Sequence, residues 1–382
     1  MKYRLTCLTP TLVGDGQKLS PIDYMVWKDH VNVLDQWRIF RLLAKGPRLE
    51  SYLSQLKRAE KLDFASWGGF AQNYAGRRIP FEDASSTQYW ERTHAEHLFI
   101  PTFSTGPSGA YLPGTAIKGA FRTGVVHGRA TERMLADLVE RSASEGRLPR
   151  HPSNSVEESA LGPPGADPLR VISAYDSATV PATTFKIYLL RTSTLEARGP
   201  GKFELGWKQL SRNVKRAEDG TPAFAEMATP GAVFEGEWRQ NAFLSQPEIG
   251  KALRRRAPIN IGVMFELVNA YTEQLLGIQK RYAEWTGLAL LKSTVEQLEA
   301  RLSAVREAQR GCVLPIGWGA GFLSKTAILN TEDDTYRQVL RQVGFYSRAI
   351  QSGLPFPKTR RIVFLGNQPA SLPGFVHLEV TG

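Results

Sequence analysis

The chain has 382 residues, of which 42% are hydrophobic and eight are tryptophan, so it can bury a large core and is not a disordered chain. Lysine and arginine total 48 against 37 acidic residues, and the net charge of +11 favours a polyanionic partner such as nucleic acid. Two cysteines exclude a disulfide framework and a cysteine zinc site. With no export leader and no apolar run near ~18 residues, we expect a cytoplasmic protein that does not contact membranes.

The N-terminal part predicts strands followed by helices. Lys2 to Thr9 alternates as a strand does, and residues 24–34 predict a hairpin. Residues 35–44 predict a helix capped by its first residue, an aspartate, and residues 49–65 predict a second helix. Residues 66–86 show no period.

The middle of the chain predicts one prominent helix among strands and loops. Pro113-Gly114 breaks an extended run, and Thr115 is the predicted N-cap of a helix that ends near Gly128. Residues 142–168 hold Pro, Gly and Ser with few apolar side chains, which predicts a flexible surface loop. Residues 192–206 are irregular in pattern. The strands predicted in this part are 169–175, 185–191 and 232–240.

The C-terminal part begins with a long helical pattern. Apolar side chains recur along one face over residues 246–309, and Gly287 is the predicted dividing point. A glycine-rich stretch follows at 317–321, then a predicted helix over 336–350. Short strands are predicted at 362–365 and 376–380. Because helices and strands do not alternate steadily, the pattern predicts an α+β fold.

The helix start at Thr115 is the strongest candidate for a ligand site. Ile117 and Phe121 lie at helical spacing and can pack inward, while Lys118 and Arg122 share another face, four residues apart. The free N–H groups of a first helical turn favour phosphate, and two cations strengthen that preference. The segment does not match a P-loop, in which the lysine follows the glycine.

Several segments resemble a known family. The stretch from Pro113 to Thr123 (Pro-Gly-Thr-Ala-Ile-Lys-Gly-Ala-Phe-Arg-Thr) resembles the signature of the RAMP proteins, the RNA-binding backbone subunits of type III CRISPR effector complexes. Residues 8–16 and 317–322 are similar to further RAMP elements. Residues 20–24 (Ser-Pro-Ile-Asp-Tyr) and 356–361 (Phe-Pro-Lys-Thr-Arg-Arg) resemble elements of the terminal subunit of the Csm (type III-A) complex. Together the matches cover most of the chain.

The resemblance implies a single RAMP unit over residues 1–382, with a ferredoxin-like (RRM-related) core that carries long helical and loop insertions. The core is then expected from about 1–35, 97–130, 169–240 and 313–382. The expected insertions are about 36–96 and 246–310, with a flexible loop over about 142–168.

The resemblance also implies a non-catalytic subunit that holds the 3′ part of crRNA, caps the backbone filament and contributes to crRNA maturation and antiviral defence. Its expected partners are crRNA, target RNA, other RAMP backbone subunits of the Csm complex and a trimming nuclease, with no cofactor and no metal. The residues expected to contact RNA are Gly114, Thr115, Lys118, Gly119, Arg122, Gly317, Trp318, Gly319, Gly321, Lys358, Arg360 and Arg361.

Alternative interpretations remain at several of these positions. The basic side chains are also compatible with a solvated helix face or strand edge, and Trp318 with a core position. A crRNA-processing endoribonuclease of the same superfamily would use a histidine such as His127. Asp23 lies in a region comparable to that of a cleaving aspartate in neighbouring backbone subunits, and Asp176 resembles another recurring RAMP aspartate of open role. A Cmr-type (III-B) or hybrid type III subunit is the third alternative.

Overall fold

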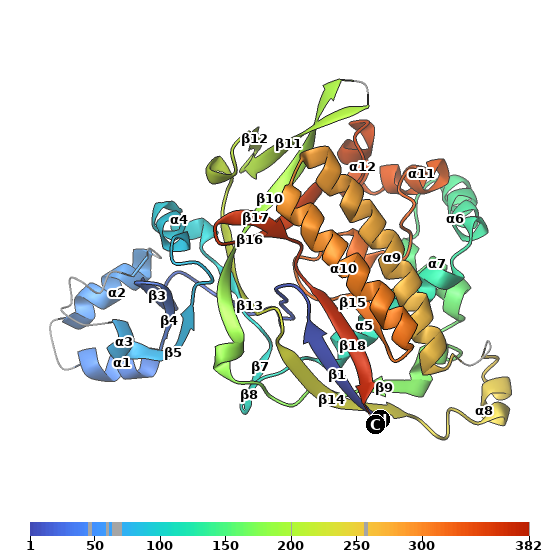
Figure 1. Cartoon of the computed structure of the whole chain (residues 1–382), viewed down its shortest axis with the longest axis horizontal. Coiled ribbons are helices and arrows are strands. Elements are labelled where there is room, and N and C mark those ends of the chain that lie inside the picture. Colours follow the sequence, from blue (N-terminus) through green and yellow to red (C-terminus); the bar gives the residue numbers. More distant parts are fainter. Residues whose placement is uncertain (45–47, 59–60, 63–70, 200, 256–258, 382) are drawn as a thin grey trace.

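The structure is a computed structural model of the chain, and it describes residues 1–44, 48–58, 61–62, 71–199, 201–255 and 259–381. Its strands pair antiparallel in every sheet, and helices pack against them or lie at their edges (Figure 1). The α+β class predicted from the sequence is confirmed. The ferredoxin-like arrangement and the division into core and insertions stay predictions.

The first sheet joins the two ends of the chain. In the described residues its order is β15 (Gly311–Pro315), β18 (Phe375–Thr381), β1 (Lys2–Cys7), β14 (Val233–Gln240) and β9 (Ile172–Ala174). Lys2 lies opposite Thr381, so the first and last strands are neighbours and the termini lie together. Tyr3 and Leu5 point into the core, which explains the alternation seen in the sequence.

The second sheet is built on one long strand. Its order is β12 (Arg212–Val214), β11 (Lys202–Gln209), β10 (Phe185–Gly199), β16 (Thr359–Leu365) and β17 (Gln368–Ser371), with β13 (Ala223–Ala228) also paired to β10. The sequence pattern ended the β10 strand at Arg191 and left residues 192–206 irregular. That prediction is wrong: the strand continues and forms a hairpin with β11, where Thr194 lies opposite Gly206.

Three helices pack on the first sheet and beside it: α5 (Gly114–Arg129), α9 (Ile261–Thr286) and α10 (Ala289–Ala308). Phe121 of α5 contacts Trp238 of β14 and Phe265 of α9, with ring centroids 5.1 and 5.9 Å apart. Gly287 ends α9 in the left-handed conformation (φ +66°), which confirms it as the point that divides the helical stretch.

Residues 8–23, between β1 and β3, form what we call the opening segment. The residues that follow it form a smaller lobe (Figure 1, blue). Its elements are β3 (Tyr24–Trp27), β4 (His30–Leu34), α1 (Gln36–Leu43), α2 (Arg48–Arg58), α3 (Ala71–Tyr74), β5 (Ala75–Pro80) and α4 (Ser86–Arg92). The Asp35 carboxylate accepts a hydrogen bond from the Arg38 amide at 2.9 Å, so the predicted helix cap is confirmed. Most of the predicted helix 49–65 is α2, and part of its second half lies outside the described residues.

The remaining elements surround this framework. They are β2 (Lys18–Leu19), β6 (Ile100–Pro101), β7 (Thr105–Gly106), β8 (Gly109–Ala110), α6 (Glu132–Glu145), α7 (Pro152–Leu161), α8 (Pro247–Ala252), α11 (Asp334–Gln342) and α12 (Gly344–Gln351). The flexible loop predicted over 142–168 is therefore wrong in part, because α7 lies within it. Val156, Ala160 and Leu161 of α7 are buried in the main core, and this burial outweighs the loop-like composition of the segment.

Candidate nucleic-acid interface

Other parts of the protein cover the N-terminus of α5. Pro113, and not Thr115, occupies the N-cap position, and Thr115 is exposed without a capping hydrogen bond, so that prediction is wrong. A Cβ on Gly114 would lie 2.3 Å from the carbonyl oxygen of Ala174, so only glycine fits the first helical position. The Gly114 amide donates to the Asp176 carboxylate at 2.9 Å, which places a protein anion where a phosphate was expected.

Both cations of the signature helix are also engaged within the protein. The Lys118 ammonium donates to the Ile172 carbonyl oxygen at 2.9 Å. Arg122 pairs with Glu157 at 2.6 Å and with Asp167, two carboxylates from the segment that contains α7. These contacts tie α5 to that segment, and the geometry does not support the predicted phosphate contacts of Lys118 and Arg122.

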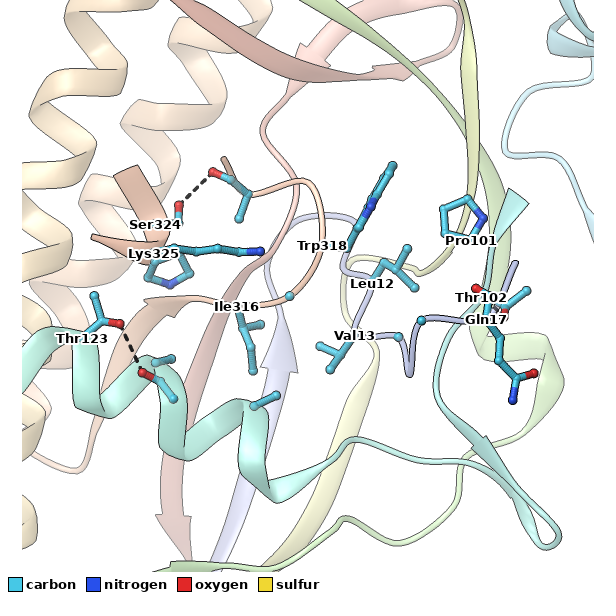
Figure 2. Close-up of a pocket in the computed structure, with 18 of the residues that line it drawn as sticks. Leu12, Val13, Gln17, Pro101, Thr102, Thr123, Ile316, Trp318, Ser324 and Lys325 are labelled. Carbon is cyan, nitrogen blue, oxygen red and sulfur yellow. Dashed lines mark hydrogen bonds between the residues drawn. The ribbon is translucent and has the colours of Figure 1, made fainter. Parts of the chain in front are cut away.

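Another face of the same helix lines a cavity of about 540 Å³ (Figure 2). Gly119 and Thr123 of α5 form one side of it, and a Cβ on Gly119 would meet no atom within 4 Å. Residues 12–14 and 16–18 of the opening segment, and residues 315–318 and 320, form other parts of the wall. The structure therefore brings together three of the segments that carry the family resemblance.

The glycine-rich loop is pinned to the opening segment. Gly317, Gly319 and Gly321 have φ values of +82°, +84° and +88°, and a Cβ on Gly317 would lie 2.1 Å from the Leu12 carbonyl oxygen. The Trp318 amide donates to that same oxygen at 2.7 Å. The glycines allow the loop to adopt this path, and the contacts of Gly317 and Trp318 with Leu12 hold it beside the cavity.

A second cavity, of about 710 Å³, continues from the first, and Trp318, Ala320 and Lys325 line both. We call the two cavities together the groove. The guanidinium of Arg361 lies 4.1 Å from the centroid of the Trp318 ring, a cation–π contact at the point where the cavities meet. Most of the remaining lining of the second cavity comes from residues 319–323, from α12 and from residues 356–361, and the rest is Thr192, Gln279 and Leu372.

The charge of the groove has one sign. Lys18 and Lys325 line the first cavity, and Lys325, Lys358, Arg360 and Arg361 line the second. Among the described residues that line either cavity there is no aspartate or glutamate. Burial lowers the pKa of Arg361, and burial together with the nearby Lys358 charge lowers the pKa of Lys208 on β11. Lysines and arginines gathered without carboxylates favour an anionic ligand.

Arg360 differs from the neighbours with which it was predicted. Its side chain is only 8% exposed, its Nε donates to Gln279 at 2.6 Å, and its guanidinium lies 4.4 Å from the centroid of the Tyr282 ring. Burial lowers its pKa to about 10. Arg360 thus joins β16 to α9 inside the protein, and the RNA contact predicted for it is not supported by this geometry.

The residues of the alternative, catalytic interpretation are held in local contacts. His127 Nδ1 lies 2.6 Å from the Ala327 carbonyl oxygen, and its ring meets the edge of Tyr271. The Asp23 carboxylate accepts hydrogen bonds from the amide and hydroxyl of Ser20, at 2.7 and 2.6 Å. Over the ranges that the structure describes, no three or more His, Cys, Asp or Glu side chains gather as a metal site requires. None of the helices in those ranges has the length and apolar character of a membrane span.

Sequence reasoning missed Lys325, Phe345 and Tyr346, which also line the groove. Lys325 lies in a short 3₁₀ turn, Leu323–Lys325, directly after the glycine-rich loop, so proximity in the sequence could have indicated it. Nothing in the sequence marks Phe345, because helix spacing alone does not show that its ring is left uncovered.

Comparison with known proteins finds relatives by structure alone. No protein-family model matches the chain, and no curated protein sequence matches it. A chain in the cryo-EM structure of a Csm–crRNA–target RNA ternary complex of a type III-A CRISPR-Cas system has a TM-score of 0.68 and 20% identity, over 99% of this chain and 100% of that one. The crystal structure of T. onnurineus Csm5 has a TM-score of 0.60 and 16% identity, over 98% and 99%. The chain therefore has, from end to end, the fold of these two proteins.

Proposed function

We propose that this protein is an RNA-binding subunit of a type III-A CRISPR effector complex, which grips RNA without cleaving it. The observation that carries the proposal is the groove, whose described lining holds lysines and two arginines and no carboxylate. The shared fold supports the type of complex, since one structural neighbour belongs to a Csm–crRNA–target RNA complex. In this role the chain holds the 3′ part of crRNA, ends the backbone filament and contributes to crRNA maturation and antiviral defence.

The division of labour between the side chains follows from their contacts. Gly119 and the glycine-rich loop let an RNA backbone approach closely, because Gly119 has open space above it and the loop is fixed against Leu12. Lys18, Lys325, Lys358 and Arg361 supply the positive charge along the path. Sequence specificity is left to guide–target base pairing, and the protein contacts the backbone and unpaired bases.

Fluorescence anisotropy with a fluorescein-labelled 12-nucleotide single-stranded RNA tests the proposal. The variant Lys325→Ala/Lys358→Ala should bind more weakly, and its log–log salt slope should flatten by about 0.7 for each phosphate that the protein no longer neutralises. Lys57→Ala/Lys251→Ala is the matched control, since it removes the same charge from exposed lysines on α2 and α8, outside the groove.

An equal loss in both double variants would mean that only the overall charge matters and would contradict the groove. Incubation of the wild-type chain with CRISPR repeat RNA tests the catalytic alternative. Cleavage that His127→Ala abolishes would replace the binding role by an endoribonuclease.

A further inference from the structure

The groove has an uncovered aromatic ring at its α12 end. Phe345, the second residue of α12, is 87% exposed and lines the second cavity. Its ring touches the edge of Tyr346, with centroids 5.2 Å apart. Tyr346 in turn packs against Phe322 and Phe356, at 5.2 and 5.4 Å. Phe345 is thus attached to a packed aromatic cluster while its own ring contacts mainly solvent.

The surroundings of this ring are cationic. Lys325, Lys358 and Arg361 line the same cavity. Arg348, three residues further along α12, is exposed and lies on the same side of the helix as Phe345. An apolar peptide gains little from such a neighbourhood, whereas a nucleic acid strand offers phosphates for the cations and a base for the ring. Alternation of aromatic and basic side chains is the arrangement by which proteins bind single strands.

We propose that Phe345 is a stacking platform for one unpaired nucleobase at the α12 end of the groove, and that Lys358 and Arg348 hold phosphates on either side of it. The inference rests on the proposed function, because it requires RNA in the groove. It assigns one of the proposed contacts with unpaired bases to a particular side chain. Since every base has a stacking face, the platform accepts any base, and adenine is held better than uracil.

Anisotropy titrations with two fluorescein-labelled 12-mers, oligoadenylate and an oligomer of the same sugar–phosphate chain without bases, test the platform. Phe345→Ala should weaken oligoadenylate binding by about 5- to 150-fold, the range for loss of one stacked base. Phe345→Trp should restore the affinity, and the salt slope should not change because no charge is removed. The base-free oligomer should bind the wild type and Phe345→Ala equally.

Phe243→Ala is the matched control, because Phe243 is another exposed phenylalanine (62%) and does not line the groove. Phe345 makes few contacts, so thermal unfolding should show both variants folded. Unchanged oligoadenylate affinity in Phe345→Ala overturns the platform even while the lysine variants confirm RNA binding. Loss of affinity for both oligomers also overturns it, since the effect would then not depend on a base. Failure of the wild type to bind either oligomer overturns both proposals. If Phe345→Ala binds RNA normally but no longer joins other subunits of the complex, the ring is a protein contact instead.

Discussion

The carboxylate of Asp176 accepts a hydrogen bond from the amide of Gly114 at 2.9 Å, across 62 positions of sequence. This contact caps α5 from a loop that follows β9. It also neutralises the positive end of the helix that the sequence offered as a phosphate site. The cationic character of the region therefore lies beside the helix, in the groove, and not at its first turn.

Asp176→Ala should lower the free energy of unfolding by about 1 kcal/mol, the usual cost of a lost cap. Asp176→Asn keeps an oxygen acceptor for the Gly114 amide and should cost less. Urea unfolding measures both. RNA affinity should stay close to wild type in Asp176→Asn, because Gly114 is buried. A gain in affinity with a steeper salt slope would show that phosphate binds at the helix start after all.

Replacement of the two signature cations should affect stability more than binding. Lys118 donates to a backbone carbonyl and Arg122 pairs with Glu157 and Asp167, so Lys118→Ala/Arg122→Ala should lose about 1–2 kcal/mol of unfolding free energy. The log–log salt slope of RNA binding should be the same as in wild type. Urea unfolding and salt titration separate the two effects. A flatter slope in a folded variant would return these residues to the RNA contact set.

The sequence identified what is local and missed what is distant. Asp35 and Gly287 begin and end helices by contacts within a few residues, and both predictions are confirmed. Lys118 and Arg122 also stand where helical spacing placed them. Their partners do not: Glu157 and Asp167 lie 35 and 45 positions after Arg122, and Gln279 lies 81 positions from Arg360. A sequence pattern can show that a cation is present, but not that it is paired with a carboxylate or buried in the core.

The same limit explains the segments that were misjudged. Residues 152–161 have a loop-like composition but form a helix because the core accepts Val156, Ala160 and Leu161. The sequence of the second half of β10 lacks a regular strand pattern. This segment is a strand because it pairs with β11 and β16, which the local sequence does not show. By contrast, the spacing of the glycines at 317–321 indicated an unusual backbone path from the sequence alone. Their positive φ values explain why glycine is needed there.

Gly119→Ala gives a direct test of where the RNA backbone passes. The position lies inside α5, and an added methyl group would have no atom within 4 Å, so alanine should raise the unfolding free energy by up to about 1 kcal/mol through its better helix propensity. The same methyl group should lower RNA affinity, because it stands where the backbone is proposed to approach. Thermal unfolding and anisotropy on one protein sample measure both. A stabilised variant with unchanged affinity would move the RNA path away from α5.

The ion pair between Arg77 of β5 and Glu226 of β13 joins the smaller lobe to the main body. The guanidinium contacts both carboxylate oxygens, at 2.7 and 3.0 Å, and the Glu226 side chain is only 1% exposed. Burial raises the pKa of Glu226, and the Arg77 charge opposes that rise. Arg77→Met leaves a buried carboxylate without its partner and should cost about 3–5 kcal/mol near neutral pH.

The pH dependence of this loss distinguishes a buried charge from poorer packing. Without Arg77, the pKa of Glu226 in the folded protein rises further above its value in the unfolded chain. The penalty is then full above the folded pKa and shrinks as the pH falls through it, because a protonated Glu226 needs no counter-charge. Urea unfolding of Arg77→Met at pH 7.5 and at 5.5 should therefore show the smaller deficit relative to wild type at the lower pH. Adding Glu226→Gln to Arg77→Met should recover stability at pH 7.5, and Arg78→Met, at the exposed neighbour on the same strand, should change little. A deficit that is equal at both pH values and that glutamine does not relieve would mean that Arg77 acts through its packing and not through its charge.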